Sequence, residues 1–156
     1  MTLEQKVAKL LINQKKTLAV SESCTGGLLC HRLTNISGSS QFFKFGWILY
    51  SNKAKTRFLK IPSWIFARHG AVSCQVAQRM AKAIRWVLDT DFGIGITGIA
   101  GPTGGSRRKP IGLVFIAVAT KDQMIYERHI FKGHRKRIKS QATTRALHLL
   151  WKLLLP

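Results

Sequence analysis

The run of residues 113–119 constrains the fold more than any other segment, because it is almost wholly apolar. A strand with one face in water alternates apolar and polar residues. A continuous apolar run of this length is typical of a central strand that is covered on both faces. Helices must then pack on both sides of a sheet, which predicts a layered α/β protein.

The other segments supply helices and strands in alternation. Apolar residues at helical spacing predict a first helix near the N-terminus and a last helix from about His134, and the turn at residues 21–27 is expected to lead into a second helix through about Leu33. Ser51 and Ser73 are expected to begin two further helices. Strands are expected over residues 17–20, 42–50, 92–97 and 113–119, and a hairpin turn at 120–123 leads to one ending near 131. We therefore expect one domain over residues 1–156.

The charge balance is strongly basic, with 26 Lys and Arg against 6 Asp and Glu and a formal net charge of +20. Such a field favours anionic ligands and non-specific nucleic-acid binding at low salt. The scarcity of acids leaves little material for mechanisms that need paired carboxylates. The composition thus indicates anionic partners and argues against glycosidase-like chemistry.

Nothing in the composition indicates a membrane or an oxidising compartment. No apolar run approaches the roughly 18 residues that a transmembrane helix needs. The first 16 residues alternate apolar with polar side chains, unlike a signal peptide. The three cysteines form no CxxC pair, which is typical of reduced thiols. We expect a cytoplasmic protein without a membrane partner.

Two familiar patterns lack the context that their functions require. Residues 93–98 read GxGxxG, but they fall inside an expected strand, whereas a dinucleotide site needs its glycines at a strand-to-helix turn. The five histidines are scattered without HxxH or HExxH spacing. We therefore expect neither a bound dinucleotide nor a metal ion, and no cofactor.

The turn at residues 21–27, Ser-Glu-Ser-Cys-Thr-Gly-Gly, is the best candidate for chemistry. A hydroxyl at a strand-to-helix turn is accessible, and free backbone N–H groups beside it can stabilise an oxyanion. On spacing alone, the alternative that Ser23 or Thr25 is only a helix N-cap is the more favoured of the two. A serine nucleophile also needs a base, and a lysine of lowered pKa can serve. Lys55 is one candidate, although an ordinary solvated lysine fits the same spacing.

Seven segments add a resemblance that covers about residues 18–150: SESCTGG, SGSS, YSNKAK, RHGAVS, TGIAGPTGG, KPIGLVF and FKGHR. Their order and spacing are similar to those of the CinA C-terminal domain family. Stand-alone members of that family are nicotinamide-nucleotide amidases, also called NMN deamidases. The resemblance implies a three-layer α/β/α sandwich on a mixed, mostly parallel sheet. It also implies conversion of nicotinamide mononucleotide and water to nicotinic acid mononucleotide and ammonia, in pyridine nucleotide salvage.

The resemblance also assigns roles to individual residues. It places the nucleophile on Ser23, with Tyr50 and Lys55 as the activating partners, and it gives Arg135 to the substrate phosphate. The further positions that it assigns to substrate binding are Thr25, Gly26, Ser40, Thr97 and Gly101. Family members commonly form dimers, so we expect a homodimer.

Three departures from the family's usual wording add positive charge near these positions. Lys53 stands where Glu is commoner, His134 replaces an acid, and Arg107-Arg108 occupy a loop where acids are frequent. Like-charge repulsion from Lys53 and the basic loop could lower the pKa of Lys55, and the substitutions could equally shift substrate preference. Two alternatives stay open beside the amidase: a nucleic-acid-binding module on the same fold, which the net charge of +20 motivates, and a catalytically idle relative.

Overall fold

A computed structural model describes all residues 1–156. Five strands form one sheet in the order β2-β1-β3-β4-β5. The first three strands along the chain are parallel, and β4 is antiparallel to both of its neighbours, so β4 alone runs against the other strands. The predicted mixed, mostly parallel sheet is confirmed. The strands are β1 (Leu18–Glu22), β2 (Phe43–Ile48), β3 (Phe92–Gly98), β4 (Leu113–Ala119) and β5 (Met124–Ile130).

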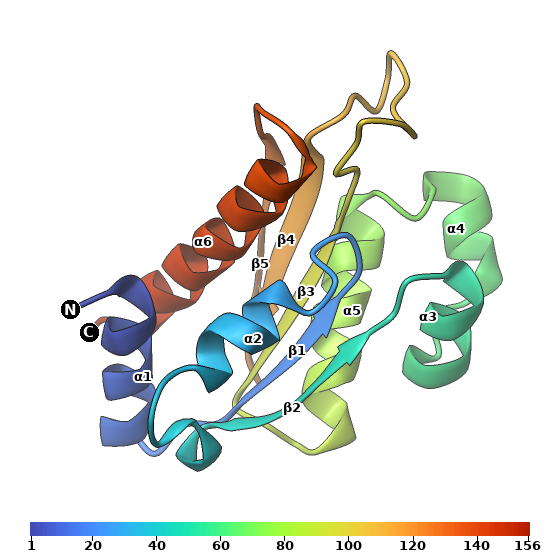
Figure 1. Ribbon diagram of the computed structural model, residues 1–156. Coiled ribbons are helices and arrows are strands. Elements are labelled where there is room, and N and C mark those ends of the chain that lie inside the picture. Colours follow the sequence, from blue (N-terminus) through green and yellow to red (C-terminus); the bar gives the residue numbers. More distant parts are fainter.

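Helices cover both faces of the sheet and complete the three predicted layers (Figure 1). One face carries α1 (Leu3–Asn13), α2 (Leu28–Thr34) and α6 (Arg135–Leu154). The other carries α5 (Cys74–Val87), with α3 (Asn52–Leu59) and α4 (Ser63–His69) beside it. A short 3-10 helix, η1 (Ser39–Gln41), precedes β2. Neither α4 nor η1 was expected, because each is too short to show a helical period.

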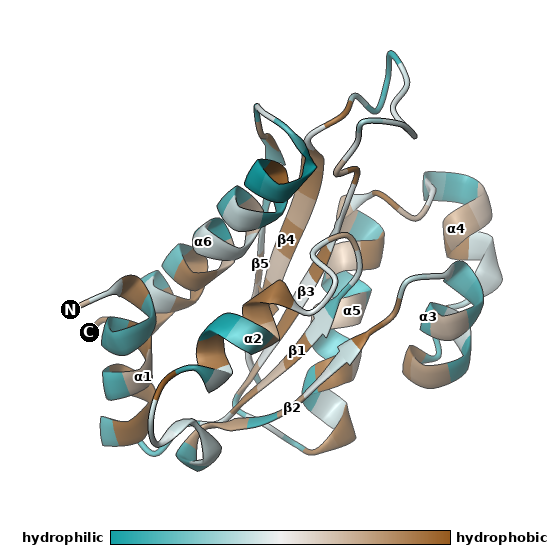
Figure 2. Cartoon of the chain, in the orientation of Figure 1, coloured by the Kyte–Doolittle hydropathy of each residue, from teal (hydrophilic) through white to brown (hydrophobic).

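The interior consists of apolar layers on either side of β4, as its sequence predicts. Val114, Ile116 and Val118 face the larger core beneath α1, α2 and α6. Ala117 and Ala119 face α5 and pack with two of its alanines. Figure 2 shows the hydrophobic sheet interior and the hydrophilic N-terminal end of α6. No helix combines the length and the apolar character that crossing a membrane requires.

The glycines of the GxGxxG pattern let α5 approach β3 closely. A Cβ atom on Gly95 would lie 2.3 Å from the carbonyl oxygen of Ala77, and one on Gly93 would lie 2.2 Å from that of Ala81. No real Cβ atom tolerates such contacts. The pattern therefore serves helix–sheet packing inside a strand and is no phosphate-binding turn, as its position in the sequence indicated.

Three helices begin where the sequence placed them. The hydroxyl of Ser51 accepts from the Ala54 N–H at 3.1 Å, and that of Ser73 accepts from the Val76 N–H at 3.3 Å. The His134 Nδ1 atom caps α6 in the same way by accepting from Arg137. These caps satisfy N–H groups that a helix start otherwise leaves without partners.

Candidate active site

Ser23 lies in the loop that follows β1, at the carboxyl ends of the three parallel strands. Its backbone N–H donates to the Ile96 carbonyl at 3.1 Å, which holds the residue against β3. The loop then turns through Gly26 and Gly27, whose φ angles of 60° and 96° favour glycine. Only 9% of Ser23 is exposed, so the nucleophile candidate is sheltered from bulk water.

Glu22 anchors this loop, a role that no sequence pattern indicated. Its side chain is fully buried, and its two carboxylate oxygens accept from the backbone N–H groups of Leu29 and Cys30, each at 3.0 Å. Hydrogen bonds to a charged acceptor are among the stronger ones. Glu22 thus ties the end of β1 to the first turn of α2. The one available signal was an acid beside Ser23 in a chain with so few acids.

Lys55 lies directly against Ser23. It comes from α3, is 2% exposed, and its ammonium nitrogen donates to the Ser23 hydroxyl oxygen at 3.0 Å. Burial lowers the pKa of Lys55, because a charged ammonium is poorly solvated inside the protein. Of the two causes that the sequence offered for a lowered pKa of Lys55, burial is the one that acts, and the neighbouring cations contribute nothing resolved.

Cys24 stands beside Ser23 but is a poor competitor as a nucleophile. Burial raises the pKa of its thiol to about 12. The thiolate is the reactive form of cysteine, so a thiol that stays protonated near neutral pH is inert. The pair that can carry nucleophilic chemistry in this loop is therefore Ser23 with Lys55.

A cavity of about 180 Å³ opens above the Ser23–Lys55 pair. Thr97 lines it from the end of β3, and its hydroxyl donates to the Ala71 carbonyl at 2.8 Å. This bond fixes the segment that leads into α5 as one wall of the cavity. The remaining lining residues are Cys24, Tyr50, Asn52, Val72, Gly98, Ala100 and Arg135.

Tyr50 and Arg135 meet at the rim of this cavity. The Arg135 guanidinium donates to the Tyr50 hydroxyl at 2.8 Å and to the Gly101 carbonyl at 2.7 Å. Tyr50 is 62% exposed, and its hydroxyl contacts neither Ser23 nor Lys55. Lys55 contacts Ser23 as expected, whereas the Tyr50 hydroxyl contacts Arg135 in place of Ser23 or Lys55.

The loop offers fewer oxyanion donors than the sequence implied. The N–H groups of Ser23 and Gly26 are already bonded, to the carbonyls of Ile96 and Ser23 respectively. The N–H groups of Cys24 and Thr25 have no partner within the chain. Thr25 is fully buried, its hydroxyl has no partner, and it does not line the cavity.

Ser40 lies away from the cavity. It belongs to η1, ahead of β2, whereas Ser23 follows β1. Because β1 and β2 are parallel, the full length of the strands separates the two serines, and η1 lies at the opposite end of the sheet (Figure 1). The structure thus brings together Ser23, Lys55, Thr97, Tyr50 and Arg135 but leaves Ser40 outside this site.

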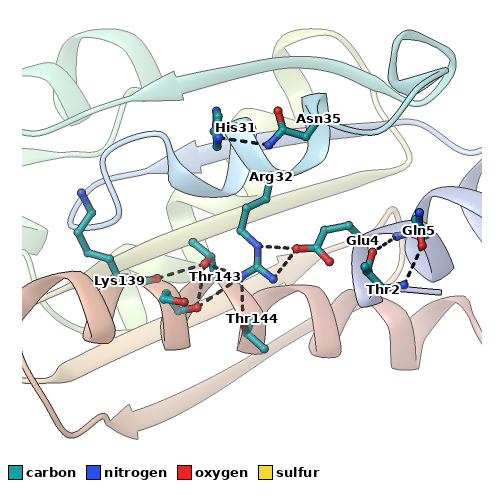
Figure 3. Close-up of polar contacts among 10 residues, drawn as sticks. Thr2, Glu4, Gln5, His31, Arg32, Asn35, Lys139, Thr143 and Thr144 are labelled. Carbon is teal, nitrogen blue, oxygen red and sulfur yellow. Dashed lines mark hydrogen bonds and ion pairs between the residues drawn. The ribbon is translucent and has the colours of Figure 1, made fainter.

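A polar network around Arg32 ties α6 to α1 and α2. Arg32 on α2 pairs with Glu4 on α1 at 2.6 Å and donates to the hydroxyls of Thr143 and Thr144 on α6, each at 2.8 Å (Figure 3). On the same helix the Lys139 side chain extends toward the loop, and its ammonium nitrogen would lie 3.3 Å from a Cβ atom on Gly26.

The surroundings of the cavity are cationic. Arg135 and Lys139, one helical turn apart on α6, have no acidic partner. Glu22 is the acid nearest in sequence to Ser23, and both of its carboxylate oxygens are hydrogen-bonded to backbone N–H groups of α2. No three His, Cys, Asp or Glu side chains are placed to hold a metal ion together. The site therefore suits an anionic organic ligand.

A family model described as the CinA C-terminal domain matches residues 1–154. The chain belongs to the CinA family. A CinA-like protein of Syntrophus aciditrophicus is 50% identical over 150 residues, which is 96% of this chain. The crystal structure of a competence-damaged protein (CinA) superfamily protein from Klebsiella pneumoniae matches with a TM-score of 0.94 at 33% identity, over 97% of this chain and 95% of that one.

The relatives differ in length. The competence/damage inducible protein CihA from Agrobacterium tumefaciens matches with a TM-score of 0.92 at 32% identity, over 99% of this chain and 98% of that chain. The match to the Syntrophus CinA-like protein, in contrast, covers only 36% of that protein. The chain thus spans little more than a third of such curated CinA relatives.

Proposed function

We propose that this CinA-family protein is a serine amidohydrolase that converts nicotinamide mononucleotide to nicotinic acid mononucleotide and ammonia. The observation that carries the proposal is the buried 3.0 Å contact between Ser23 and Lys55. A hydroxyl beside an amine of lowered pKa is a recognised arrangement for nucleophilic catalysis. The substrate itself comes from the resemblance of the site segments to nicotinamide-nucleotide amidases.

The geometry supports a two-stage reaction. The Ser23 Oγ atom attacks the carboxamide carbon while its proton passes to Nζ of Lys55. The N–H group of Cys24, which lines the cavity and has no partner within the chain, is the donor available to the negative oxygen of the tetrahedral intermediate. Lys55 returns the proton to the leaving nitrogen, and ammonia departs from an ester on Ser23. Lys55 then activates a water molecule, which cleaves the ester and releases the carboxylic acid.

The cationic rim supports a nucleotide substrate. Arg135 is held at the cavity mouth with further N–H donors unused, and a guanidinium fits the oxygens of a phosphate. The positive field around the site raises the local concentration of anions. A mononucleotide supplies both the carboxamide for Ser23 and a phosphate for this rim.

Ammonia release from nicotinamide mononucleotide tests the proposal. We expect turnover by the wild type and its loss in Ser23→Ala and Lys55→Met. Lys53→Met is the matched control, because Lys53 is an exposed lysine on the same helix. Turnover that survives in Ser23→Ala would refute the mechanism, and no turnover by folded wild-type protein would refute the substrate.

The net charge of +20 supports a second candidate, non-specific binding of nucleic acid. Such binding would weaken steeply with salt and would be unaffected by Ser23→Ala. Titration of a labelled duplex at two salt concentrations, beside the amidase assay, separates the two functions.

A further inference from the structure

The cavity at Ser23 is too small for the substrate that the site is proposed to take. Its volume is about 180 Å³, whereas pockets for whole organic ligands typically measure about 300–1,000 Å³. It can hold the reacting carboxamide and part of its ring. The remainder of a mononucleotide must lie outside it.

A second cavity, of about 520 Å³, adjoins the first. Ala100 and Arg135 line both cavities, so they form the wall between them. The lining of the second cavity combines apolar and basic side chains and includes no acid. Its other lining residues are Pro102, Ile111, Gly133, His134 and Lys136.

Arg135 is fixed in this dividing position by two other segments. The Tyr50 hydroxyl, between β2 and α3, accepts from one terminal nitrogen of the guanidinium. The Gly101 carbonyl, in the loop between β3 and β4, accepts from the other. An exposed arginine otherwise samples many rotamers, so both bonds preorganise it for an anion.

We infer that the nucleotide spans both cavities across Arg135, and that Tyr50 is a positioning residue that acts on substrate affinity by holding this arginine. The inference rests on the proposed function. It accounts for a tyrosine whose oxygen faces a guanidinium and contacts neither Ser23 nor Lys55. Tyr50 then contributes to binding the phosphate-bearing part of the substrate and takes no part in proton transfer.

The first test compares Tyr50→Phe with Tyr126→Phe, which alters the only other tyrosine of the chain. For nicotinamide mononucleotide we expect Tyr50→Phe to raise KM about tenfold, the equivalent of one lost hydrogen bond, with little change in kcat. For nicotinamide riboside, which lacks the phosphate, we expect no difference from the wild type. Tyr126→Phe should leave both substrates unaffected. A fall in kcat on both substrates would identify a proton-transfer role and overturn the inference.

The second test is a double-mutant cycle with Arg135→Gln. If Tyr50 acts through Arg135, Tyr50→Phe adds nothing once the arginine is absent. Effects of the two substitutions that add independently would overturn the inference. The Kd of nicotinamide mononucleotide is measured by equilibrium dialysis for the same four proteins: the wild type, the two single variants and the double variant.

The two readouts separate this inference from the proposed function. If the protein turns over nicotinamide mononucleotide and the effects of Tyr50→Phe and Arg135→Gln are additive, the inference alone is refuted. If the protein binds the nucleotide without converting it, the proposed reaction is refuted, and additivity or non-additivity of the Kd changes then tests the inference. Wild-type protein that neither binds nor converts nicotinamide mononucleotide refutes both.

Discussion

The ammonium nitrogen of Lys55 lies 3.0 Å from the hydroxyl oxygen of Ser23, although the two residues are 32 positions apart in the sequence. The contact is buried, and burial lowers the pKa of Lys55 from its ordinary value of 10.5. A lysine in this environment can lose its proton closer to neutral pH than a surface lysine does.

Activity should rise with pH as Lys55 loses its proton. A general base works only in its deprotonated form, so kcat/KM should be low in acid and reach a plateau below the ordinary lysine pKa. The measurement is kcat/KM for nicotinamide mononucleotide from acidic to alkaline pH. A profile that keeps rising up to pH 10.5 would show that Lys55 titrates as an ordinary lysine.

Replacement of Lys55 by methionine should make the protein more stable while abolishing activity. The lowered pKa means that the unfolded chain binds this proton more tightly than the folded protein does. Lys55 therefore costs stability progressively as pH falls from 10.5 toward its folded-state pKa. We expect Lys55→Met to gain about 1 kcal/mol in free energy of unfolding at neutral pH. Urea unfolding of this variant and of Lys53→Met checks it, and a destabilised Lys55→Met contradicts it.

Glu22→Gln should weaken both the fold and the site. The amide keeps one acceptor oxygen but presents an NH₂ group to the second backbone N–H, so one of the bonds to Leu29 and Cys30 is lost. We expect a loss of about 2 kcal/mol and slower labelling of Ser23 by a serine-directed phosphonate. Asp122→Asn, which changes an exposed acid, is the control. Unchanged stability and labelling would show that Glu22 does not anchor the loop.

The Glu127–Arg145 pair should make stability sensitive to acid. The hydrogen bond from Arg145 is the main cause that lowers the pKa of Glu127 to about 2. Because the folded-state pKa lies below 4.5, this stabilisation is present above pH 4.5 and disappears as pH falls toward 2. We expect Glu127→Gln to cost about 1 to 2 kcal/mol at neutral pH, allowing for solvent screening. Thermal unfolding at pH 7 and pH 3 should show this difference shrinking in acid.

Gly95→Ala should be strongly destabilising. The added methyl group would lie 2.3 Å from the Ala77 carbonyl oxygen, and α5 would have to move away from β3. We expect a loss of about 3 kcal/mol, in the upper range for overpacking. Equilibrium unfolding in urea measures it, and wild-type stability would show that α5 yields easily.

The sequence predicted the layers well, because strands and long helices leave periodic patterns. The apolar run of β4 indicated a strand covered on both faces, and Ser51 and Ser73 marked helix starts. Helix α4 left no such trace, since its seven residues lie between Pro62 and Gly70. Periodicity needs more than two turns to be visible.

The site was less accessible from the sequence. Spacing alone favoured a simple N-cap at Ser23 and left Lys55 as one candidate base among many lysines, and the family resemblance singled out the pair. The bond between Tyr50 and Arg135 joins residues 85 positions apart, and the chain gives no local signal of it. Glu22 looked like any acid, because its partners are backbone N–H groups that no sequence pattern displays.

The contact between α5 and β3 has a mechanical consequence for the cavity. α5 packs directly on the backbone of Gly93 and Gly95. The cavity wall at Ala71 leads into α5 and is bonded to Thr97, so this wall cannot move outward without moving the helix. On the other side, Arg135 is held by hydrogen bonds to the Gly101 carbonyl and the Tyr50 hydroxyl, and no such close backbone packing stands behind it. A ligand of different size would therefore be accommodated by a movement of the Arg135 side chain, while the wall at Ala71 keeps its position.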